Sequence, residues 1–420
     1  MKTAKPQAKQ TGNSSPKPLD GFKALEWTDF VAGPFCTKLL AALGAEVIKV
    51  EEPGAGDIAR RRGPFLRDIP HPERSALFLF LNTDKKGVTL NLKSAAGREI
   101  FKKLVKEVDV LVVEQPPALV EELGLGYQSL SEINPRLIMS SITPFGQAGP
   151  YRDYKSYYLN NFHAGGSGYV TPFDPQNPRR DREPLILGGF FGEYHGGLNA
   201  ALAIMAALYT RMMMGVGQHI DISKQETLLN AQRPDMARYL HEGNPVTRSG
   251  SNIPGGLRRS SGIMPCRDGY LNMHINENQV PIVFEMMGNS ELAKDERFTP
   301  ENLPAHRPEF DALVQEWIKD HTRDEIWHAA QQRGIPIAAI YSVGEAAHSE
   351  HLQDRGFFGE LDHPAAGRLR YPAIPFKLSK TPLKFQRAAP LLGEHNEEIY
   401  CRWLGYSQED LAAMRRTGVI

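Results

Sequence analysis

The chain has 420 residues, with 49 Lys and Arg against 49 Asp and Glu, so its formal net charge is zero. A neutral chain of this length can bury one large core or two modest ones, and it lacks the overall positive field that favours nucleic acid. Its three cysteines form no Cys-x-x-Cys pair, which argues against a disulfide framework or a metal site and predicts a reducing compartment, the cytoplasm. Residues 1–19 lack the apolar run of a signal peptide, so we expect a disordered tail there.

Segments with strand and helix patterns alternate through the first half of the chain. Strands are predicted, in chain order, at 21–27, 47–51, 87–92, 109–113 and 136–142, with helix-like runs between them. This alternation predicts an α/β fold with a Rossmann-like parallel sheet covered by helices on both faces. The turn after the first strand lacks the G-x-G-x-x-G pattern of dinucleotide-binding proteins, so we do not expect NAD.

The most apolar stretch of the chain runs from Gly197 to Met214. It is short for a membrane span, contains Asn199 and Arg211, and has no strongly basic flank, so we expect a buried helix and no membrane partner. A strand at 217–223 and a helix from Lys224 towards Tyr239 follow. A Gly, Pro, Ser and Arg-rich loop at 244–269 then leads into a smaller α+β region.

Six motifs occur in a fixed order along the chain. The first is the run AGPFCTKLLAALGAEVIKVE with the following PGAGDIAR, and the others are NxxKxGVTLNLK, NPRLI, FGQAGPY, GQHIDIS and APLLGEH. They lie at 32–60, 82–93, 134–138, 145–151, 217–223 and 389–395. In this order they resemble the class III (family III) coenzyme A transferases from residue 20 to the C-terminus.

The resemblance implies an interlocked dimer, either a homodimer or a heterodimer with a paralogous subunit. Residues 20–215 would form the first part of a large domain. Residues 216–335 would contain a linker helix, a glycine loop and a smaller α+β domain, and residues 336–420 would return to the large domain. Coenzyme A, carried as an acyl-CoA, and a carboxylic acid would be the substrates, with no metal.

The resemblance also implies covalent catalysis by a carboxylate, which forms a mixed anhydride and then an enzyme-bound thioester with coenzyme A. The family places an Asp in a D-x-x-x-G-L pattern, and this chain reads GEYHGGL, so Glu193 stands at that position. Glu is one methylene longer than Asp, and a displacement of about 1 Å in a near-attack arrangement can cost about a hundredfold in rate. Without the family context, Glu193 would be interpreted as a solvated carboxylate at a helix start.

The resemblance assigns coenzyme A contacts to six further positions: the turn residues Val31 and Ala32, the strand-end residues Leu90 and Lys93, and Lys155 with Tyr157. Two positions where relatives commonly carry phosphate-binding arginines are Glu52 and Glu122 in this chain. A carboxylate repels a pyrophosphate that an Arg would bind bidentately. The run Arg60–Arg62 is a candidate replacement, although such a run is also typical of a solvated face.

A glycine-containing loop of the family closes over the anhydride, and residues 250–259 occupy the equivalent region here. Gly255 and Gly256 would supply backbone freedom, and Arg258 or Arg259 would bind the acceptor acid. A plain flexible connector is the alternative interpretation of this segment.

Three functions therefore remain open. The first is an active transferase that takes coenzyme A from an acyl-CoA such as succinyl-CoA. The second is an impaired subunit of a heteromeric member, such as the succinyl-CoA:benzylsuccinate type. The third is an α-methylacyl-CoA racemase, in which the family His matches Tyr157, a poor base at neutral pH, with His163 and His195 nearby. Aromatic side chains near the expected site would suit an acceptor from aromatic acid degradation, with packing near a dimer core as the alternative interpretation: Tyr151, Tyr154, Tyr158, Phe190 and Phe191.

Overall fold

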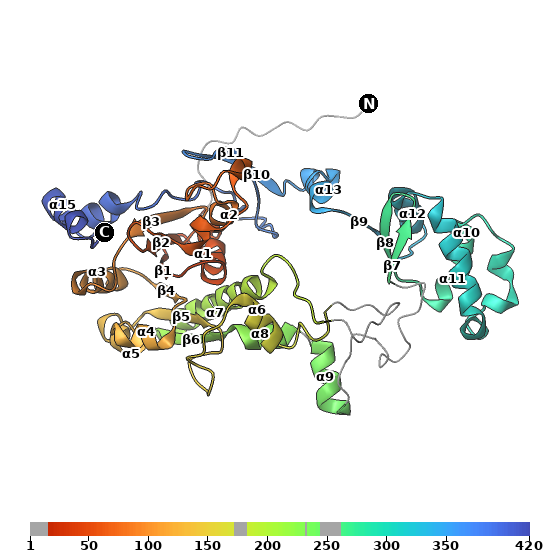
Figure 1. Ribbon diagram of the computed structural model, residues 1–420, viewed down its shortest axis with the longest axis horizontal. Coiled ribbons are helices and arrows are strands. Elements are labelled where there is room, and N and C mark those ends of the chain that lie inside the picture. The colour runs from red at the N-terminus through yellow and green to blue at the C-terminus, as the bar shows by residue number, and fades with distance from the viewer. Residues whose placement is uncertain (1–15, 172–182, 232, 244–261) are drawn as a thin grey trace. The chain divides into compact units, whose positions relative to one another are not determined.

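The computed structural model describes residues 16–171, 183–231, 233–243 and 262–420 (Figure 1). Its contacts divide the chain into two compact units. The large unit takes its residues from 1–168, 186–237 and 356–420, and the small unit takes them from 169–185 and 238–355. The unit boundaries therefore fall at other residues than the expected 215 and 335, because strands on both sides of those positions pair within a unit.

A six-stranded sheet forms the centre of the large unit, in the order β3-β2-β1-β4-β5-β6. Every strand pair is parallel, which confirms the predicted Rossmann-like sheet. The strands are β1 (Lys23–Trp27), β2 (Glu46–Glu51), β3 (Lys85–Thr89), β4 (Val110–Val113), β5 (Ile138–Thr143) and β6 (Gln218–Ser223). The strand order reverses between β1 and β4, and in such sheets ligands bind at the carboxyl ends of the strands beside this point.

Helices cover both faces of this sheet (Figure 1). The helices of the large unit are α1 (Ala32–Ala42), α2 (Ala76–Leu81), α3 (Ala95–Lys106), α4 (Pro117–Glu122), α5 (Tyr127–Ile133), α6 (Tyr158–Ala164), α7 (Phe191–Met214), α8 (Lys224–Ala231) and α15 (Gln408–Arg416), and α9 (Arg233–Glu242) begins in this unit and ends in the small one. Adjacent residues of β1 show the two faces. Leu25 belongs to a core with α3, α5 and α15, whereas Ala24 belongs to a core with α1 and α7. Alternation along a strand thus builds two separate hydrophobic layers.

Glycines bring α7 unusually close to α1. A Cβ atom at Gly197 would lie 2.3 Å from the Ala32 carbonyl oxygen, and one at Gly196 would lie 3.1 Å from Cγ of Lys224. The start of α7 therefore packs directly on the start of α1, and the Lys224 side chain passes beside Gly196. This packing fixes the position of the first turn of α7.

The predicted buried helix at 197–214 is only half buried. One face of α7 contacts α1 and the sheet, while the side chains of Leu202, Tyr209 and Met212 on the other face are 68%, 67% and 73% exposed. By length and composition alone, α7 could cross a membrane. In the structure, α7 packs together with α1 on one face of the sheet.

The C-terminal segment covers the edge strand β3. The Tyr400 hydroxyl donates to the Thr89 carbonyl at 2.7 Å, and the Thr89 amide donates to Oδ1 of Asn396 at 2.9 Å. These bonds occupy backbone groups that an edge strand otherwise leaves open. The hairpin of β10 (Phe358–His363) and β11 (Gly367–Pro372) belongs to the same unit.

The small unit has an antiparallel sheet of β7 (Gly262–Cys266), β8 (Gly269–Met273) and β9 (Ile337–Ile340). Its helices are α10 (Val280–Met286), α11 (Leu303–Lys319), α12 (Arg323–Gln331), α13 (Val343–Ala347) and α14 (Glu350–Asp354). The expectation of a loop at 244–269 is wrong for the part that forms β7. The pairing of β7 with β8 supplies hydrogen bonds that the sequence pattern does not reveal. The pairing of β9 with β8 moves residues 336–355 into this unit.

The close approach of the two helices predicts the effect of a Gly197→Ala substitution. The added methyl would meet the Ala32 carbonyl oxygen, so we expect the free energy of unfolding to fall by about 1–3 kcal/mol. Urea denaturation measures this change. Gly188→Ala is the matched control, because a Cβ there meets no atom within 4 Å. Equal stability of both variants would contradict the tight packing.

Candidate active site

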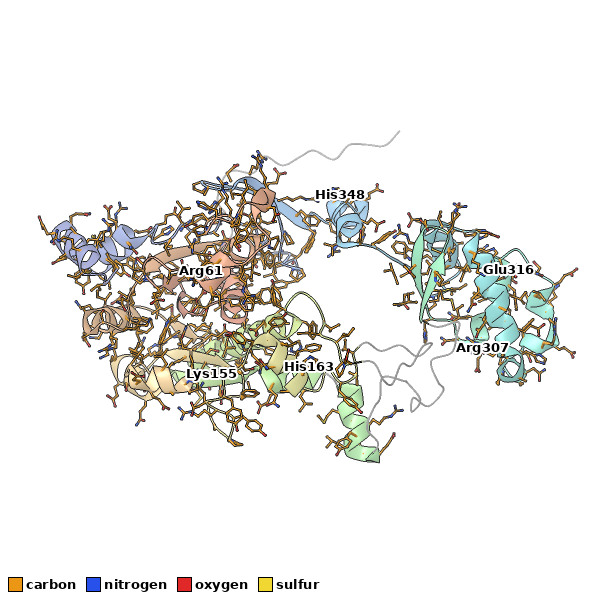
Figure 2. All side chains as sticks on the ribbon, in the orientation of Figure 1. Arg61, Lys155, His163, Arg307, Glu316 and His348 are labelled. Atoms are coloured by element: carbon orange, nitrogen blue, oxygen red, sulfur yellow. The ribbon has the colours of Figure 1, made fainter. Side chains whose placement is uncertain are left out.

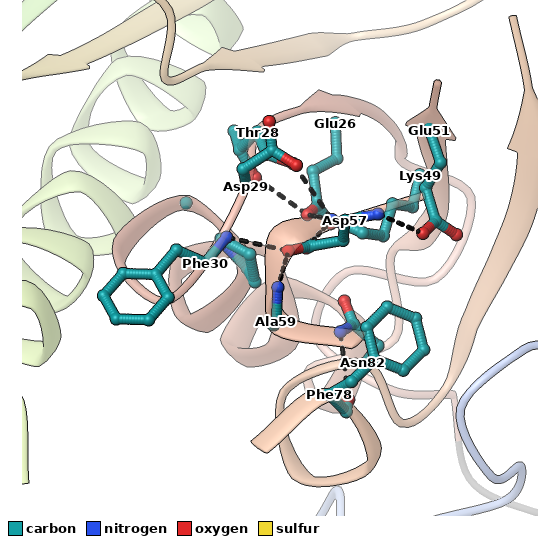
Figure 3. Close-up of polar contacts among 12 residues, drawn as sticks. Glu26, Thr28, Asp29, Phe30, Lys49, Glu51, Asp57, Ala59, Phe78 and Asn82 are labelled. Carbon is teal, nitrogen blue, oxygen red and sulfur yellow. Dashed lines mark hydrogen bonds and ion pairs between the residues drawn. The ribbon is translucent and has the colours of Figure 1, made fainter. Parts of the chain in front are cut away.

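A network of buried charges supports the turn between β1 and α1 (Figure 3). Lys49 of β2 pairs with Glu26 at 2.7 Å and with Asp57 at 2.8 Å, and all three side chains are fully buried. Lys85 of β3 pairs with the second oxygen of Glu26 at 2.8 Å. Burial alone would raise the pKa of Glu26, but Lys49 and Lys85 outweigh burial and lower this pKa to about 2. Glu26 is therefore an ionised carboxylate inside the protein.

This network holds the backbone of the turn itself. Lys49 Nζ donates to the Thr28 carbonyl at 3.0 Å, and the Phe30 amide donates to Oδ1 of Asp57 at 2.9 Å. Phe30 adopts a positive φ of 70°, which is uncommon for a residue with a side chain. Val31 and Ala32 follow this turn with no exposed surface. The two residues expected to pass under the coenzyme thus have a fixed backbone.

Glu193 lies in the first turn of α7 and is 3% exposed. Lys224 Nζ donates to both of its carboxylate oxygens, at 2.9 and 3.1 Å. The same ammonium donates to Oε1 of Glu114 at 2.9 Å. Lys224 is the first residue of α8, directly after β6, and Glu114 directly follows β4. Two strand ends and one helix start thus place a lysine between two carboxylates.

The second oxygen of Glu114 is bonded as well. Oε2 accepts the Gly33 amide of the first turn of α1 at 2.8 Å. Burial and the neighbouring Glu193 raise the pKa of Glu114 to about 7, although Lys224 opposes them. Burial would lower the pKa of Lys224, but Glu114 and Glu193 outweigh burial and raise it. Lys224 is therefore a permanent ammonium in the resting site.

A cavity of about 260 Å³ opens at the carboxyl ends of β1 to β4, beside the reversal of strand order. Its lining includes Leu90 and Lys93, as the sequence predicts for coenzyme contacts, together with Gln115, which adjoins Glu114. Asp29 also lines the cavity, and burial and Asp57 raise its pKa to about 6. This cavity is the candidate nucleotide site.

The charged side chains at the cavity include carboxylates, unlike those of a simple phosphate-binding site. Lys93 Nζ pairs with Glu52, another lining residue, at 2.8 Å. Arg60 is fully buried and binds Glu51 at 2.7 Å and Glu73 at 2.6 Å, so the idea that it replaces a lost phosphate ligand is wrong. Its guanidinium is fully engaged in the protein interior. Arg61 and Arg62 are exposed.

Other predicted residues lie away from these contacts. Lys155 is exposed in the segment before α6 (Figure 2), and Tyr157 is 75% exposed. Glu122 is exposed at the end of α4, where Leu119 and Leu123 rather than Glu122 line the cavity. The loop residues Gly255, Gly256, Arg258 and Arg259 lie outside the described residues.

Aromatic side chains gather before Glu193. Phe190 immediately precedes α7 and has a positive φ of 59°. Its ring packs edge-on against Phe30 at 4.8 Å and against Tyr158 at 5.0 Å between centroids. The residues that precede α1 and α7 thus touch each other. Within the described part of the chain, no cluster of three His, Cys, Asp or Glu side chains could hold a metal ion.

Sequence reasoning missed Glu114, Lys224 and Asp29. Each directly follows a strand or lies one residue beyond it, at the edge where parallel strands place ligand sites. Lys224 directly follows the motif at 217–223, so the sequence could have indicated it as a candidate site residue. The pairing of Lys224 with Glu193 was not predictable, because it depends on the packing of α7 against α1.

The fold and site define an α/β protein with a cavity at the strand reversal and a buried carboxylate, Glu193, linked through Lys224 and Glu114 to the wall of that cavity. Residues 19–396 match the model of CoA-transferase family III, and the chain belongs to this family of transferase enzymes. It is 34% identical to a succinyl-CoA–D-citramalate CoA-transferase of Chloroflexus aurantiacus, over 96% of this chain and 98% of the relative. It is also 34% identical to a formyl-CoA:oxalate CoA-transferase of Bradyrhizobium diazoefficiens, over 96% and 97%.

A solved structure has the same fold. A CAIB/BAIF family protein from Brucella suis superposes with a TM-score of 0.80 at 32% identity, over 92% of this chain and 99% of that chain. The family resemblance drawn from the motifs is therefore confirmed, and so is transferase activity that uses coenzyme A.

The buried triad predicts a large effect of Lys224→Met. This change keeps the apolar stem but leaves Glu114 and Glu193 without their cation, so we expect the free energy of unfolding to fall by about 3–5 kcal/mol. Urea denaturation measures the loss. Lys102→Met is the control, because Lys102 pairs with Glu99 at the surface and should leave stability nearly unchanged. A small loss in Lys224→Met would contradict the buried pairing.

The raised pKa of Glu114 predicts a pH effect on stability. The unfolded chain releases this proton near pH 4.5, whereas the folded chain keeps it to about pH 7. Because the folded state binds more protons between these values, the Glu114 contribution to stability is largest below pH 4.5 and falls as pH rises towards 7. Glu114→Gln should flatten this fall, measured by urea midpoints across the range. The exposed Glu107→Gln should leave the slope as in the wild type.

Proposed function

We propose that this chain transfers coenzyme A from an acyl-CoA to a carboxylic acid, with Glu193 as the nucleophile. The observation that carries this proposal is the buried Glu193 carboxylate, whose two oxygens both bond to the Lys224 ammonium. These two hydrogen bonds hold the carboxylate in one orientation, which an attack on a carbonyl carbon requires. Its position in the first turn of a 24-residue helix adds a favourable dipole.

The reaction proceeds by exchange at the carbonyl carbons of the donor, of Glu193 and of the acceptor. A Glu193 oxygen attacks the donor thioester, the C–S bond breaks, and a mixed anhydride and coenzyme A thiolate form. The thiolate attacks the Glu193 carbonyl and releases the donor acid, which leaves a Glu193 thioester. The acceptor carboxylate attacks that thioester and forms a second anhydride. The released thiolate then attacks the acceptor carbonyl and regenerates the Glu193 carboxylate.

The extra methylene of Glu193 has a compensating partner in this chain. A longer side chain has one more rotatable bond, so it loses orientation unless a neighbour holds it. Two hydrogen bonds from one ammonium restrict the rotation of the Glu193 carboxylate. Lys224 thus supports the proposal that Glu replaces Asp as a working nucleophile.

Coenzyme A would occupy the cavity beside the strand reversal, with Leu90 and Lys93 at its wall and Val31 and Ala32 at the turn. Lys155 and Tyr157 would approach the nucleotide from the segment before α6. Phosphate binding by Lys93 would require it to exchange its Glu52 partner for a phosphate oxygen. The pair is exposed, so this exchange has a small cost.

We propose succinyl-CoA as the donor and an aromatic or dicarboxylic acid as the acceptor. One relative is named as a transferase between succinyl-CoA and D-citramalate, and the other as a transferase between formyl-CoA and oxalate. The contact of Phe30, Phe190 and Tyr158 before Glu193 supports a bulky acceptor, because aromatic faces bind flat apolar groups. The cytoplasm stays the predicted location.

An interlocked dimer is the proposed assembly. The exposed face of α7 presents Leu198, Leu202, Tyr209 and Met212 at helical spacing, which suits burial against another chain. The partner would be a second copy or a paralogous subunit. A heteromer in which this chain is the impaired half is the alternative, motivated by Glu52 at the cavity, where relatives commonly carry an arginine.

Trapping of the covalent intermediate tests the nucleophile. Purified protein incubated with succinyl-CoA should give a Glu193 hydroxamate with hydroxylamine, detected by peptide mass spectrometry, because hydroxylamine attacks the thioester. Glu193→Gln should give none, and Glu193→Asp should still be trapped at the same position. No adduct in the wild type would count against the proposal.

The same assay separates the alternatives. Trapping and coenzyme A exchange that require a co-purified paralogous chain would show the impaired subunit of a heteromer. Deuterium exchange at the α-carbon of an acyl-CoA, without coenzyme A exchange, would show a racemase instead.

A further inference from the structure

The Lys224 ammonium uses all of its hydrogen atoms on two carboxylates. An ammonium has three N–H donors, and here the acceptors are both oxygens of Glu193 and Oε1 of Glu114, at distances of 2.9 to 3.1 Å. The Lys224, Glu193 and Glu114 side chains are only 9%, 3% and 12% exposed. This arrangement places a potential amine nucleophile against the very carboxyl group that becomes acylated.

Acylation of Glu193 places a reactive carbonyl carbon beside the Lys224 nitrogen. This inference rests on the proposed role of Glu193. A Glu193 thioester is neutral, so Lys224 loses the negative charge of Glu193 as its counter-ion. If Lys224 lost its proton, its free amine would attack the Glu193 carbonyl carbon. The C–S bond would break, coenzyme A would leave as the thiol, and an amide bond would join the two side chains. That amide would end catalysis permanently.

We propose that Glu114 is a positioning residue that keeps Lys224 protonated while Glu193 is acylated, and so prevents this internal crosslink. Oε1 of Glu114 lies 2.9 Å from Nζ, and its other oxygen accepts the Gly33 amide at 2.8 Å. The carboxylate is therefore tethered on both sides and stays with Lys224 when Glu193 changes state. The Gly33 amide also stabilises the ionised form of Glu114.

The charges balance in both states of the site. In the resting state burial and repulsion from Glu193 favour a proton on Glu114. Acylation removes the Glu193 charge, while the Lys224 ammonium and the Gly33 amide, which favour the ionised form, stay in place, so Glu114 gives its proton to solvent. One carboxylate then faces one ammonium. The buried site holds no net charge in either state, which is what a poorly solvated position requires.

Glu114→Gln breaks this balance only after acylation. In the resting variant, Lys224 and Glu193 still form a one-to-one ion pair, so the variant should fold. In the acylated variant, Lys224 is a buried cation with no counter-ion, and burial lowers the pKa of such a lysine. The free amine then forms next to the thioester carbonyl.

The test uses the full-length protein with succinyl-CoA, followed by intact-mass and peptide mass spectrometry. The wild type should carry a coenzyme A thioester that hydroxylamine removes. Glu114→Gln should accumulate a species lighter than the unmodified chain by one water molecule, with the peptides of Glu193 and Lys224 joined. Its activity should decay with each turnover, whereas the wild type keeps a constant rate.

Rescue variants separate the positioning role from a merely structural one. In Glu114→Gln with Lys224→Arg, the guanidinium stays charged without a counter-ion, so we expect no crosslink and a steady rate. Glu114→Asp keeps the charge and should also stay uncrosslinked. A Glu114→Gln enzyme that turns over steadily without a crosslink would overturn the inference.

The wild type gives a second measurement that needs no variant. Held as the thioester without an acceptor acid, it should lose coenzyme A only by hydrolysis and return to its original mass. Conversion of the wild-type thioester into the lighter crosslinked species would show that Glu114 gives no protection. If the wild type forms no Glu193 adduct at all, the proposed function itself fails and this inference fails with it.

Discussion

The pairing of buried Lys49 with Glu26 and Asp57 is the constraint on which the rest of the large unit depends. An unpaired charge at these positions would be very costly, so the network tolerates only one arrangement of β1, β2 and the segment that carries Asp57. That arrangement sets the Thr28 carbonyl and the Phe30 amide, and therefore the start of α1. A strained turn is held here by charge rather than by glycine.

The start of α1 then determines the site. Its Gly33 amide binds Glu114, Glu114 binds Lys224, and Lys224 binds Glu193. Each link joins a different element: α1, the end of β4, the start of α8 and the first turn of α7. A shift of any one of them would alter the position of the nucleophile. Such coupling explains why Gly196 and Gly197, which carry no chemistry, are needed where α7 crosses α1.

The sequence predicts the parallel sheet and the position of Glu193 because strand patterns and family motifs are local signals. The resemblance also assigns coenzyme contacts to Leu90 and Lys93, and both residues line the cavity. Local signals do not reveal charge partners that are far apart in sequence. Arg60 therefore looked like a phosphate ligand but binds Glu51 and Glu73, and Lys224 received no role. The strand β7 was missed for the same reason, because its partner rather than its composition makes it a strand.

Two residues with a strained backbone conformation, Phe30 and Phe190, allow α1 and α7 to begin at the same site. Phe30 and Phe190 both have positive φ, at a cost of about 1–3 kcal/mol each, and each lies within two residues of a helix start. Their rings touch at 4.8 Å, so the two strained turns support each other. The N-termini of α1 and α7 consequently point into one region, where their partial positive charges meet Glu114 and Glu193. The helix ends thus add to Lys224 in stabilising negative charge at this buried site, whether that charge lies on Glu193 or on Glu114.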